Sequence, residues 1–69
     1  MPALQSDALL AVRYDAKRHA LRATFRDNRR TYVYDGVTQA EYDALLAADS
    51  KGAWFNTHIK PNHPYREVG

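Results

Sequence analysis

The stretch RRTYVYDGVTQAEYDALLAADSKGAWFNTHIK, residues 29–60, decides the fold of this chain. It begins as a strand, because residues 30–35 (RTYVYD) are rich in β-branched and aromatic side chains. Gly36 ends that strand, and the sequence TQAE at residues 38–41 then fits a capping box. In a capping box the first and fourth side chains bond each other's backbone amides, so a helix is expected to follow.

The expected helix has an apolar stripe at helical spacing. Val37, before the cap, and Tyr42, at the fourth helical position, fit a hydrophobic staple. The stripe consists of Tyr42, Leu45, Leu46 and Ala48. This spacing predicts a helix over residues 39–48 whose stripe faces the core.

A second, shorter helix is expected over residues 51–60. Ser50 offers an N-cap, and Phe55 and Ile59, four residues apart, can share one buried face. Pro61 ends the segment because its ring cannot continue a helix. The tail after it, NHPYREVG, contains a further proline and is interpreted as extended or irregular.

Two more strands precede this stretch. Residues 8–14 and 19–26 alternate between apolar and other side chains, which is typical of half-buried strands. The expected inward-facing residues are Leu10, Val12 and Tyr14 in the first strand and Leu21, Ala23 and Phe25 in the second. Residues 15–18 form a polar connection of hairpin length, and Asp27-Asn28 is a second turn signal.

These elements predict an α+β fold. It consists of a three-stranded antiparallel β-meander followed by one well-capped helix and a second short helix, both packed on one face of the sheet. The apolar face of the meander is then covered, and the face that carries its arginines stays in water. The number of residues, 69, allows a single domain over the whole chain.

The composition restricts the class of protein further. The 45% hydrophobic and 26% charged content indicates a globular chain, and the absence of cysteine excludes disulfides and thiolate zinc sites. The first residues, MPALQSDALLAV, lack the pattern of a secretory signal. No run approaches the roughly 18 apolar residues of a membrane span, so a cytoplasmic location without membrane contact is expected.

Basic residues are concentrated in one part of the chain. The net charge is only +2, but residues 13–34 hold seven Lys or Arg against two Asp, whereas residues 35–69 hold three against five acidic residues. Charge on surface strands can serve solubility and blunt edge pairing. With its interleaved aromatics, this basic segment also predicts contact with RNA or another single-stranded nucleic acid. The expected phosphate contacts are Arg22, Arg26, Arg29 and Arg30.

Tyr32 and Tyr34 allow two interpretations. Residues two apart in a strand point the same way, so this pair lies together on one face. On the open face the two rings would stack on bases and join the nucleic-acid site. On the other face they would pack against the helices, and the need of Phe25 and the Tyr42 helix for a partner surface favours this second placement.

A protein-interaction module is the alternative function. Its expected contact patch comprises Trp54, Asn56, His58 and Lys60. Two adjacent aromatic residues in a helix cannot both face the core, so burial of Phe55 would leave Trp54 partly exposed. An exposed tryptophan beside amide and cationic groups is typical of a contact surface, although the indole could equally fold over the edge of the core.

No set of residues predicts catalysis or a metal site. Ser50 lacks the sharp turn and glycine pattern of a hydrolase nucleophile and is interpreted as an N-cap. His58 and His63 lack further ligands at zinc spacing, and Asp43 and Asp49 are interpreted as solvated carboxylates. The chain is therefore expected not to be an enzyme and to hold no cofactor.

Several motifs in the second half of the chain match one known family. They are Tyr32-Val33-Tyr34, Val37, Tyr42, Leu45-Leu46-Ala47-Ala48 and the run Ser50-x-Gly52-x-x-Phe55-Asn56-x-x-Ile59-Lys60. Together they resemble the KTSC domain, a small bacterial domain named after the C-terminal end of some lysyl-tRNA synthetases. The resemblance spans residues 6–68 and implies a soluble domain for which RNA binding has been suggested through the synthetase connection. The turn before Tyr32 usually carries Gly in this family and is one residue longer here, which leaves the register of the third strand open.

Overall fold

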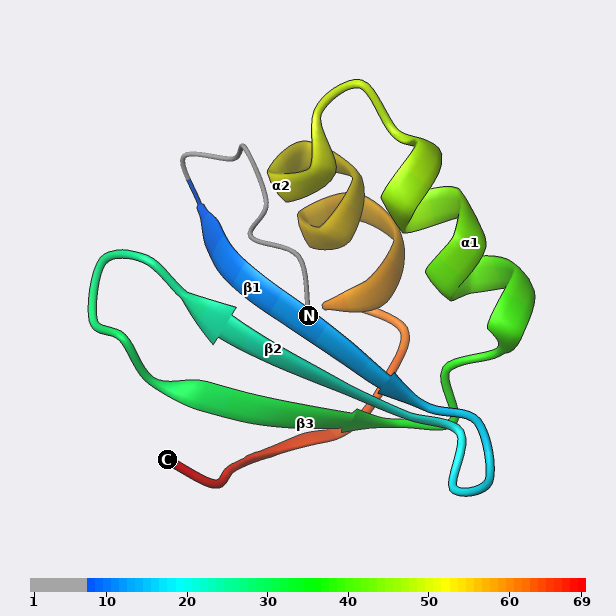
Figure 1. Ribbon diagram of the computed structural model, residues 1–69, viewed down its shortest axis with the longest axis horizontal. Helices are drawn as coiled ribbons and strands as arrows, with labels where there is room; N and C mark the ends of the chain where they lie inside the picture. Colours follow the sequence, from blue (N-terminus) through cyan, green and yellow to red (C-terminus); the bar gives the residue numbers. More distant parts are fainter. Residues whose placement is uncertain (1–7) are drawn as a thin grey trace.

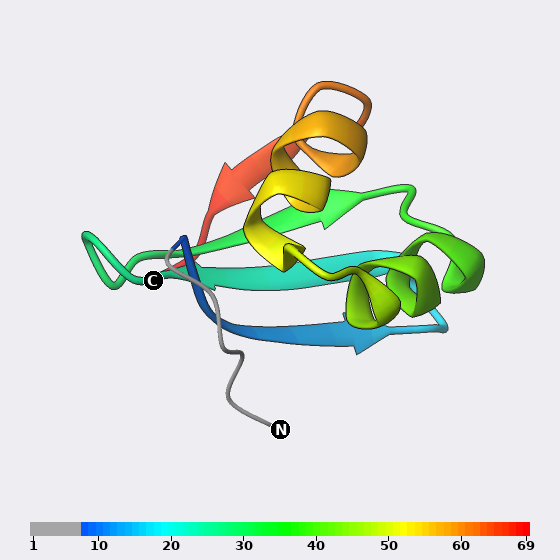
Figure 2. The ribbon, with the colours of Figure 1, turned by 90° about the horizontal axis from the view of Figure 1, so that it is seen from above.

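The computed structural model describes residues 8–69. They form one antiparallel sheet in the order β1-β2-β3-β4, with helical segments covering one of its faces (Figures 1 and 2). The strands are β1 (Leu9–Asp15), β2 (Ala20–Phe25), β3 (Thr31–Asp35) and β4 (Tyr65–Glu67). The helical segments are α1 (Gln39–Ala47), α2 (Lys51–Trp54) and the π-helical turn η1 (Phe55–Ile59). The predicted α+β fold is confirmed, with one strand more than expected.

The additional strand, β4, comes from the tail that was expected to be extended or irregular. Tyr34 pairs with Tyr65 and Tyr32 with Glu67, so β4 lies along the outer edge of β3. The ladder continues beyond the strand, because the Asp35 amide donates to the Pro64 carbonyl at 2.9 Å. Proline is tolerated at the beginning of an edge strand. Pro64 therefore directly precedes β4 and does not prevent it.

The beginning of β1 departs from the predicted alternation. The register between β1 and β2 shifts between Leu9 and Ala11, so one extra residue is accommodated there. A bulge of this kind reverses the side-chain alternation on one side of it. Leu9 is therefore fully buried together with Val12, whereas Leu10 is only half-buried. The expectation that Leu10 faces the core and Leu9 does not was wrong.

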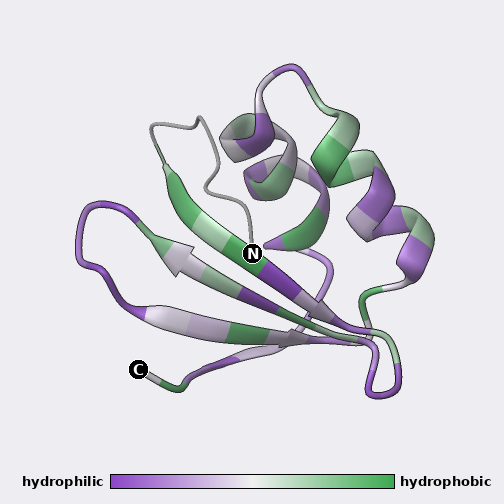
Figure 3. Cartoon of the chain, viewed as in Figure 1, coloured by the Kyte–Doolittle hydropathy of each residue, from purple (hydrophilic) through white to green (hydrophobic). Residues whose placement is uncertain are grey.

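Both turns are closed by their own polar side chains. In the first turn, Asp15 Oδ1 accepts hydrogen bonds from the Lys17 and Arg18 amides at 3.0 and 3.2 Å, and His19 has a left-handed φ of 50°. In the second, Asn28 Oδ1 accepts from the Arg30 amide at 2.9 Å. The longer second turn is accommodated by Arg29, whose φ is 57°. It is hydrophilic throughout (Figure 3).

The register of β3 is fixed by its pairing with β2. Tyr32 stands opposite Ala23 and Tyr34 opposite Leu21. Because paired residues of antiparallel strands point the same way, both tyrosines share the inward face with these two core residues.

Helix α1 begins as the capping box predicts. Thr38 Oγ1 accepts from the Glu41 amide at 3.1 Å, and Glu41 Oε1 accepts from the Thr38 amide at 3.0 Å. Leu45 is fully buried, and Tyr42 stacks on Tyr14 with ring centroids 5.0 Å apart. Leu46, in contrast, is 37% exposed, so its assignment to the inward stripe was wrong. The helix touches the sheet along a narrower line than the stripe suggested.

The segment after α1 supplies the centre of the core. Phe55 and Ile59 are both fully buried, as their spacing predicts. The helix widens at this point, because the Lys60 amide bonds the Phe55 carbonyl at 3.0 Å across a π-type turn. Pro61 has no amide with which to continue the pattern. The expected helix over 51–60 is therefore a short α-helical turn followed by a π turn.

Candidate nucleic-acid interface

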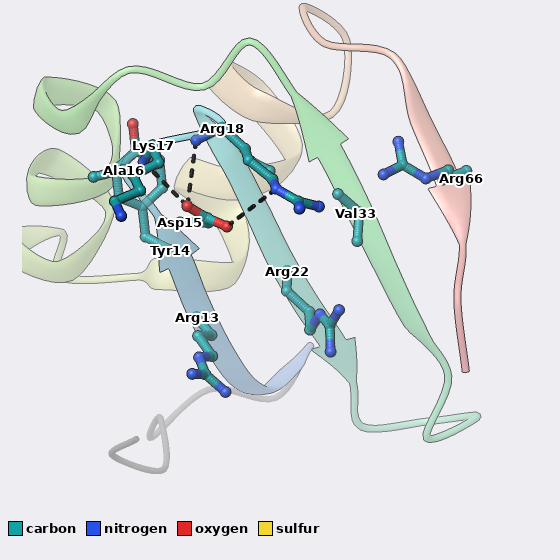
Figure 4. A pocket seen from close by; sticks show the side chains of 10 residues that line it. Arg13, Tyr14, Asp15, Ala16, Lys17, Arg18, Arg22, Val33 and Arg66 are labelled. Atoms are coloured by element: carbon teal, nitrogen blue, oxygen red, sulfur yellow. Dashed lines mark hydrogen bonds and ion pairs between the residues drawn. The ribbon is translucent and has the colours of Figure 1, made fainter.

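A row of arginines crosses the face of the sheet opposite to the helices. Arg13 of β1 stands directly opposite Arg22 of β2, Arg22 opposite Val33 of β3, and Val33 opposite Arg66 of β4. Paired residues point to the same side, so the four side chains form one line across the sheet (Figure 4). With neighbouring strands about 4.8 Å apart, Arg13 and Arg22 are close neighbours, and Arg66 lies about 10 Å from Arg22.

The same face is hollowed into an open depression of about 600 Å³. Five cationic side chains line it: Arg13, Lys17, Arg18, Arg22 and Arg66. Asp15 is the carboxylate among the lining residues, and it is the last residue of β1, directly before the turn to β2. The hollow is therefore positively charged.

Two of these arginines are partly neutralised and two are not. Arg66 Nη1 lies 2.8 Å from Asp35 Oδ2, and Arg18 Nε lies 3.9 Å from Asp15 Oδ2. Within residues 8–69, Arg13 and Arg22 form no ion pair with a carboxylate. Like charges directly opposite each other on adjacent strands are destabilising. An anion bound between the two guanidinium groups would remove this repulsion.

Val33 gives the row an apolar centre. Its side chain belongs to the open face and yet is only 6% exposed. Its neighbours across the two adjacent strands are Arg22 and Arg66, whose aliphatic stems can cover an apolar side chain while their charged ends stay in water. The stems of these two arginines are therefore the groups placed to shield Val33 from water.

The structure separates the predicted phosphate contacts into two groups. Arg22 lies in the arginine row, whereas Arg26, Arg29 and Arg30 belong to the turn between β2 and β3, at the opposite end of the sheet from the first turn (Figure 1). Arg30 bonds Glu67 of β4, an interaction that raises the pKa of its guanidinium. Only Arg22 of the predicted four therefore belongs to the hollow.

Tyr32 and Tyr34 are not on the arginine face. Tyr34 is 1% exposed and packs edge-to-face against Phe55, with ring centroids 5.0 Å apart. Burial, reinforced by Tyr65 and Tyr32, raises its pKa to about 12. Tyr32 is half-buried and contacts Phe25 and Tyr65. Their inclusion in a base-stacking site on the open face is therefore corrected: the pair belongs to the core side of the sheet, the placement that the packing argument favours.

The predicted protein-contact patch lies on the helical layer. Trp54 is half-buried against the core, and its ring stacks on the His58 imidazole with centroids 4.5 Å apart and planes inclined by 17°. Asn56, His58 and Lys60 are exposed. Trp54 is thus partly exposed, as expected, and its indole also packs against the core, as the alternative placement required.

A polar junction between α1 and the segment before β4 has no counterpart among the predicted features. His63 Nε2 lies 2.8 Å from Glu41 Oε2, and His63 Nδ1 lies 3.1 Å from the Asp35 carbonyl oxygen. Desolvation raises the pKa of Glu41, but hydrogen bonds from the Thr38 amide and from His63 outweigh it and lower this pKa overall. No local spacing connects residues 41 and 63, so the sequence predicted the capping box of Thr38 and Glu41 but not the contacts of His63.

Arg13 and Arg66 were also absent from the predicted site. Arg13 could be predicted only from the exact register of the hairpin, because the strand pairing decides which residue faces Arg22. Arg66 could be found only after β4 is recognised as a strand. Among residues 8–69 there is no group of three or more His, Asp or Glu side chains arranged to hold a metal ion. The same residues contain no helix with the length and apolarity needed to cross a membrane.

Comparisons with known proteins identify the family of this chain. A KTSC domain model matches residues 5–65 of this chain. An uncharacterised protein of Stutzerimonas stutzeri (strain A1501) is 39% identical over 61 residues, which cover 88% of this chain and 84% of that protein. The crystal structure of a KTSC domain protein from Yersinia pestis superimposes with a TM-score of 0.92 at 31% identity, covering 99% of this chain and 94% of the other. The chain therefore belongs to the KTSC domain family.

Proposed function

We propose that this protein is a small, non-catalytic module that binds nucleic acid, with RNA as the expected ligand, through the open face of its sheet. The observation that carries the proposal is the direct juxtaposition of Arg13 and Arg22 without a neutralising carboxylate in the described chain. A sheet face with no ligand would be more stable with opposite charges at these two positions. The planar guanidinium fork can bind a phosphate group through two hydrogen bonds at once.

The chemistry of this face favours contacts to the nucleic-acid backbone. Guanidinium groups follow the row across the sheet, and the inward tyrosines are on the other side of it. Such contacts position a strand without reading its sequence. The link of the KTSC name with lysyl-tRNA synthetases makes tRNA a reasonable first ligand and a cytoplasmic location the corresponding compartment, and both are part of the proposal.

The test is a fluorescence anisotropy titration of a short labelled single-stranded RNA at about 50 and 200 mM salt. The wild type is compared with the double variant Arg13→Ala/Arg22→Ala. Lys60→Ala is the matched control, because it removes a positive charge from the helical layer and leaves the arginine row intact. Removing one arginine–phosphate interaction should lower the slope of log affinity against log salt by about 0.7 for a single strand.

The double variant should therefore bind weakly at low salt and show a flatter salt dependence, while Lys60→Ala binds like the wild type. Saturable binding with the same affinity at both salt concentrations would contradict a phosphate site. A loss of log affinity in Lys60→Ala that is half of the loss in the double variant, which removes two charges, would show that only the net charge matters and not the row.

A protein-interaction role for the Trp54–Lys60 patch is the second candidate. It is favoured by the stacking of Trp54 on His58, which holds two aromatic rings together at the surface of the helical layer. A preformed aromatic pair of this kind costs little side-chain entropy when a partner binds. Contacts through it would respond weakly to salt, in contrast to those of the arginine row.

The same variants test this second candidate in the opposite direction. Cross-linking in cells followed by mass spectrometry should identify a partner that Arg13→Ala/Arg22→Ala retains and that Trp54→Ala no longer binds. A partner that disappears only with the double arginine variant would refute the Trp54 surface as its binding site.

A further inference from the structure

Strand β4 presents an aromatic ring and an arginine on opposite sides of the sheet edge. Tyr65 and Arg66 are consecutive in the strand, and successive side chains of a strand point to opposite faces. Arg66 closes the arginine row on the open face, whereas Tyr65 pairs with Tyr34 and lies on the helical side. Since β4 is the last strand of the sheet, nothing in the described chain pairs with its outer edge.

The Tyr65 ring is held in place and still largely accessible. It contacts Tyr34, with centroids 5.3 Å apart and planes inclined by 33°, and meets Tyr32 edge-to-face at 5.7 Å. These contacts restrict its rotation, yet 57% of the residue remains exposed to solvent. An aromatic ring that is anchored on one side and open on the other is a stacking platform for a nucleobase.

The neighbourhood of Tyr65 also contains a positive charge. Glu67 lies on the same side of β4, and it bonds Arg30 from the turn between β2 and β3. A strand that reaches this side of the sheet would therefore meet a guanidinium group near the tyrosine, although a carboxylate accompanies it.

We propose that a single strand of nucleic acid crosses the β4 edge, with its phosphates on the arginine row and a base stacked on Tyr65. This inference rests on the proposed function and adds the base contact that the open face itself lacks. It predicts a preference for single strands, because the bases of a duplex are already paired and stacked and cannot turn around the edge of a sheet. It also predicts little discrimination between bases, because every base has a π-face.

The experiment compares the wild type, Tyr65→Ala and Tyr65→Phe in their binding to a labelled single-stranded RNA, to the duplex of the same sequence and to inorganic polyphosphate. Tyr65→Phe keeps the ring and serves as the matched control. Removal of one base stack should weaken single-strand binding by about 5- to 150-fold in Tyr65→Ala, with Tyr65→Phe close to the wild type. Polyphosphate binding should be the same in all three proteins, because it uses only the arginines.

A measurement on the wild type avoids dependence on how well Tyr65→Ala folds. The ring protons of Tyr65 should shift upfield in the NMR spectrum when single-stranded RNA is added, and not when polyphosphate is added. Unchanged ring protons at saturation with RNA, or equal RNA affinity of Tyr65→Ala and the wild type, would overturn the base contact while leaving the arginine site intact. A wild type that binds neither RNA nor polyphosphate would overturn the proposed function as well.

Discussion

Replacing Arg13 by glutamate should stabilise the fold and abolish anion binding at the same time. In the wild type Arg13 and Arg22 face each other across β1 and β2 as two like charges. Arg13→Glu converts this repulsive pair into an attractive one in the same register. Stability alone would favour a negative charge at position 13, so it does not explain the arginine.

The expected gain follows from the position of the pair. An opposite-charge pair on adjacent strands contributes about 0.2–1 kcal/mol, and the repulsion that disappears is of similar size. Asp15, two residues along β1 on the same face, opposes part of this gain, although it is already engaged by Arg18 and by turn amides. A net stabilisation of about 0.5–1 kcal/mol is expected, which raises the Tm of a domain of this size by about 2–8 °C.

Thermal unfolding followed by circular dichroism measures the stability, and anisotropy titration with single-stranded RNA measures the binding. Arg13→Gln is the matched control, because it removes the repulsion without adding an attraction and should give a smaller rise in Tm. Added salt should reduce the gain of Arg13→Glu, since the pair is exposed to solvent. A lower Tm for Arg13→Glu than for Arg13→Gln at low salt would refute the electrostatic reasoning, and unchanged RNA affinity would remove Arg13 from the binding site.

Two further perturbations test the core and the polar junction. Phe55→Ala should cost about 3–5 kcal/mol, comparable with the whole stability of a small domain, because Phe55 is fully buried between Phe25 and Tyr34. Urea denaturation should show that Phe55→Ala is unfolded or barely folded and that Phe55→Leu remains folded. A loss of stability below about 1 kcal/mol in Phe55→Ala would contradict this packing. The pKa of Glu41 is lowered in the folded state, so its contribution is present above the pKa of the unfolded chain and is lost as the pH falls through the folded value. The difference in urea midpoint between the wild type and Glu41→Gln should therefore be present at neutral pH and close as the pH falls below 4.5, the ordinary pKa of a glutamate, and a difference that does not change with pH would contradict this assignment.

The elements with local signals were the ones that could be predicted. The capping box identified the beginning of α1, and the spacing of Phe55 and Ile59 identified the buried side of the following segment. Strand β4 could not be found in this way, because its three residues are exposed and have no alternation of their own. It is a strand because the edge of β3 offers backbone groups to it, which is a property of the folded sheet.

The candidate site was missed in part because the first turn is shifted by one residue. A loop over residues 15–18 would place Arg22 opposite Ala11, whereas the observed turn pairs Asp15 with Ala20 and so brings Arg22 opposite Arg13. The side chain of Asp15 stabilises this turn by accepting from two amides within it. The hydrogen bonds of the turn therefore determine which residue faces Arg22. The alternation of hydropathy along the strands does not predict these hydrogen bonds.

The arginine row is the place where the requirements of folding and the observed residues disagree. Other polar side chains support the fold: Thr38 and Glu41 cap a helix, and Asp35 of β3 pairs with Arg66 of β4. Arg13 and Arg22 oppose it, because their charges repel within the same sheet. A local conflict of this kind is expected where a residue serves a ligand instead of the fold. If Arg13→Glu does raise the stability and abolish RNA binding, the conflict itself will have located the binding site.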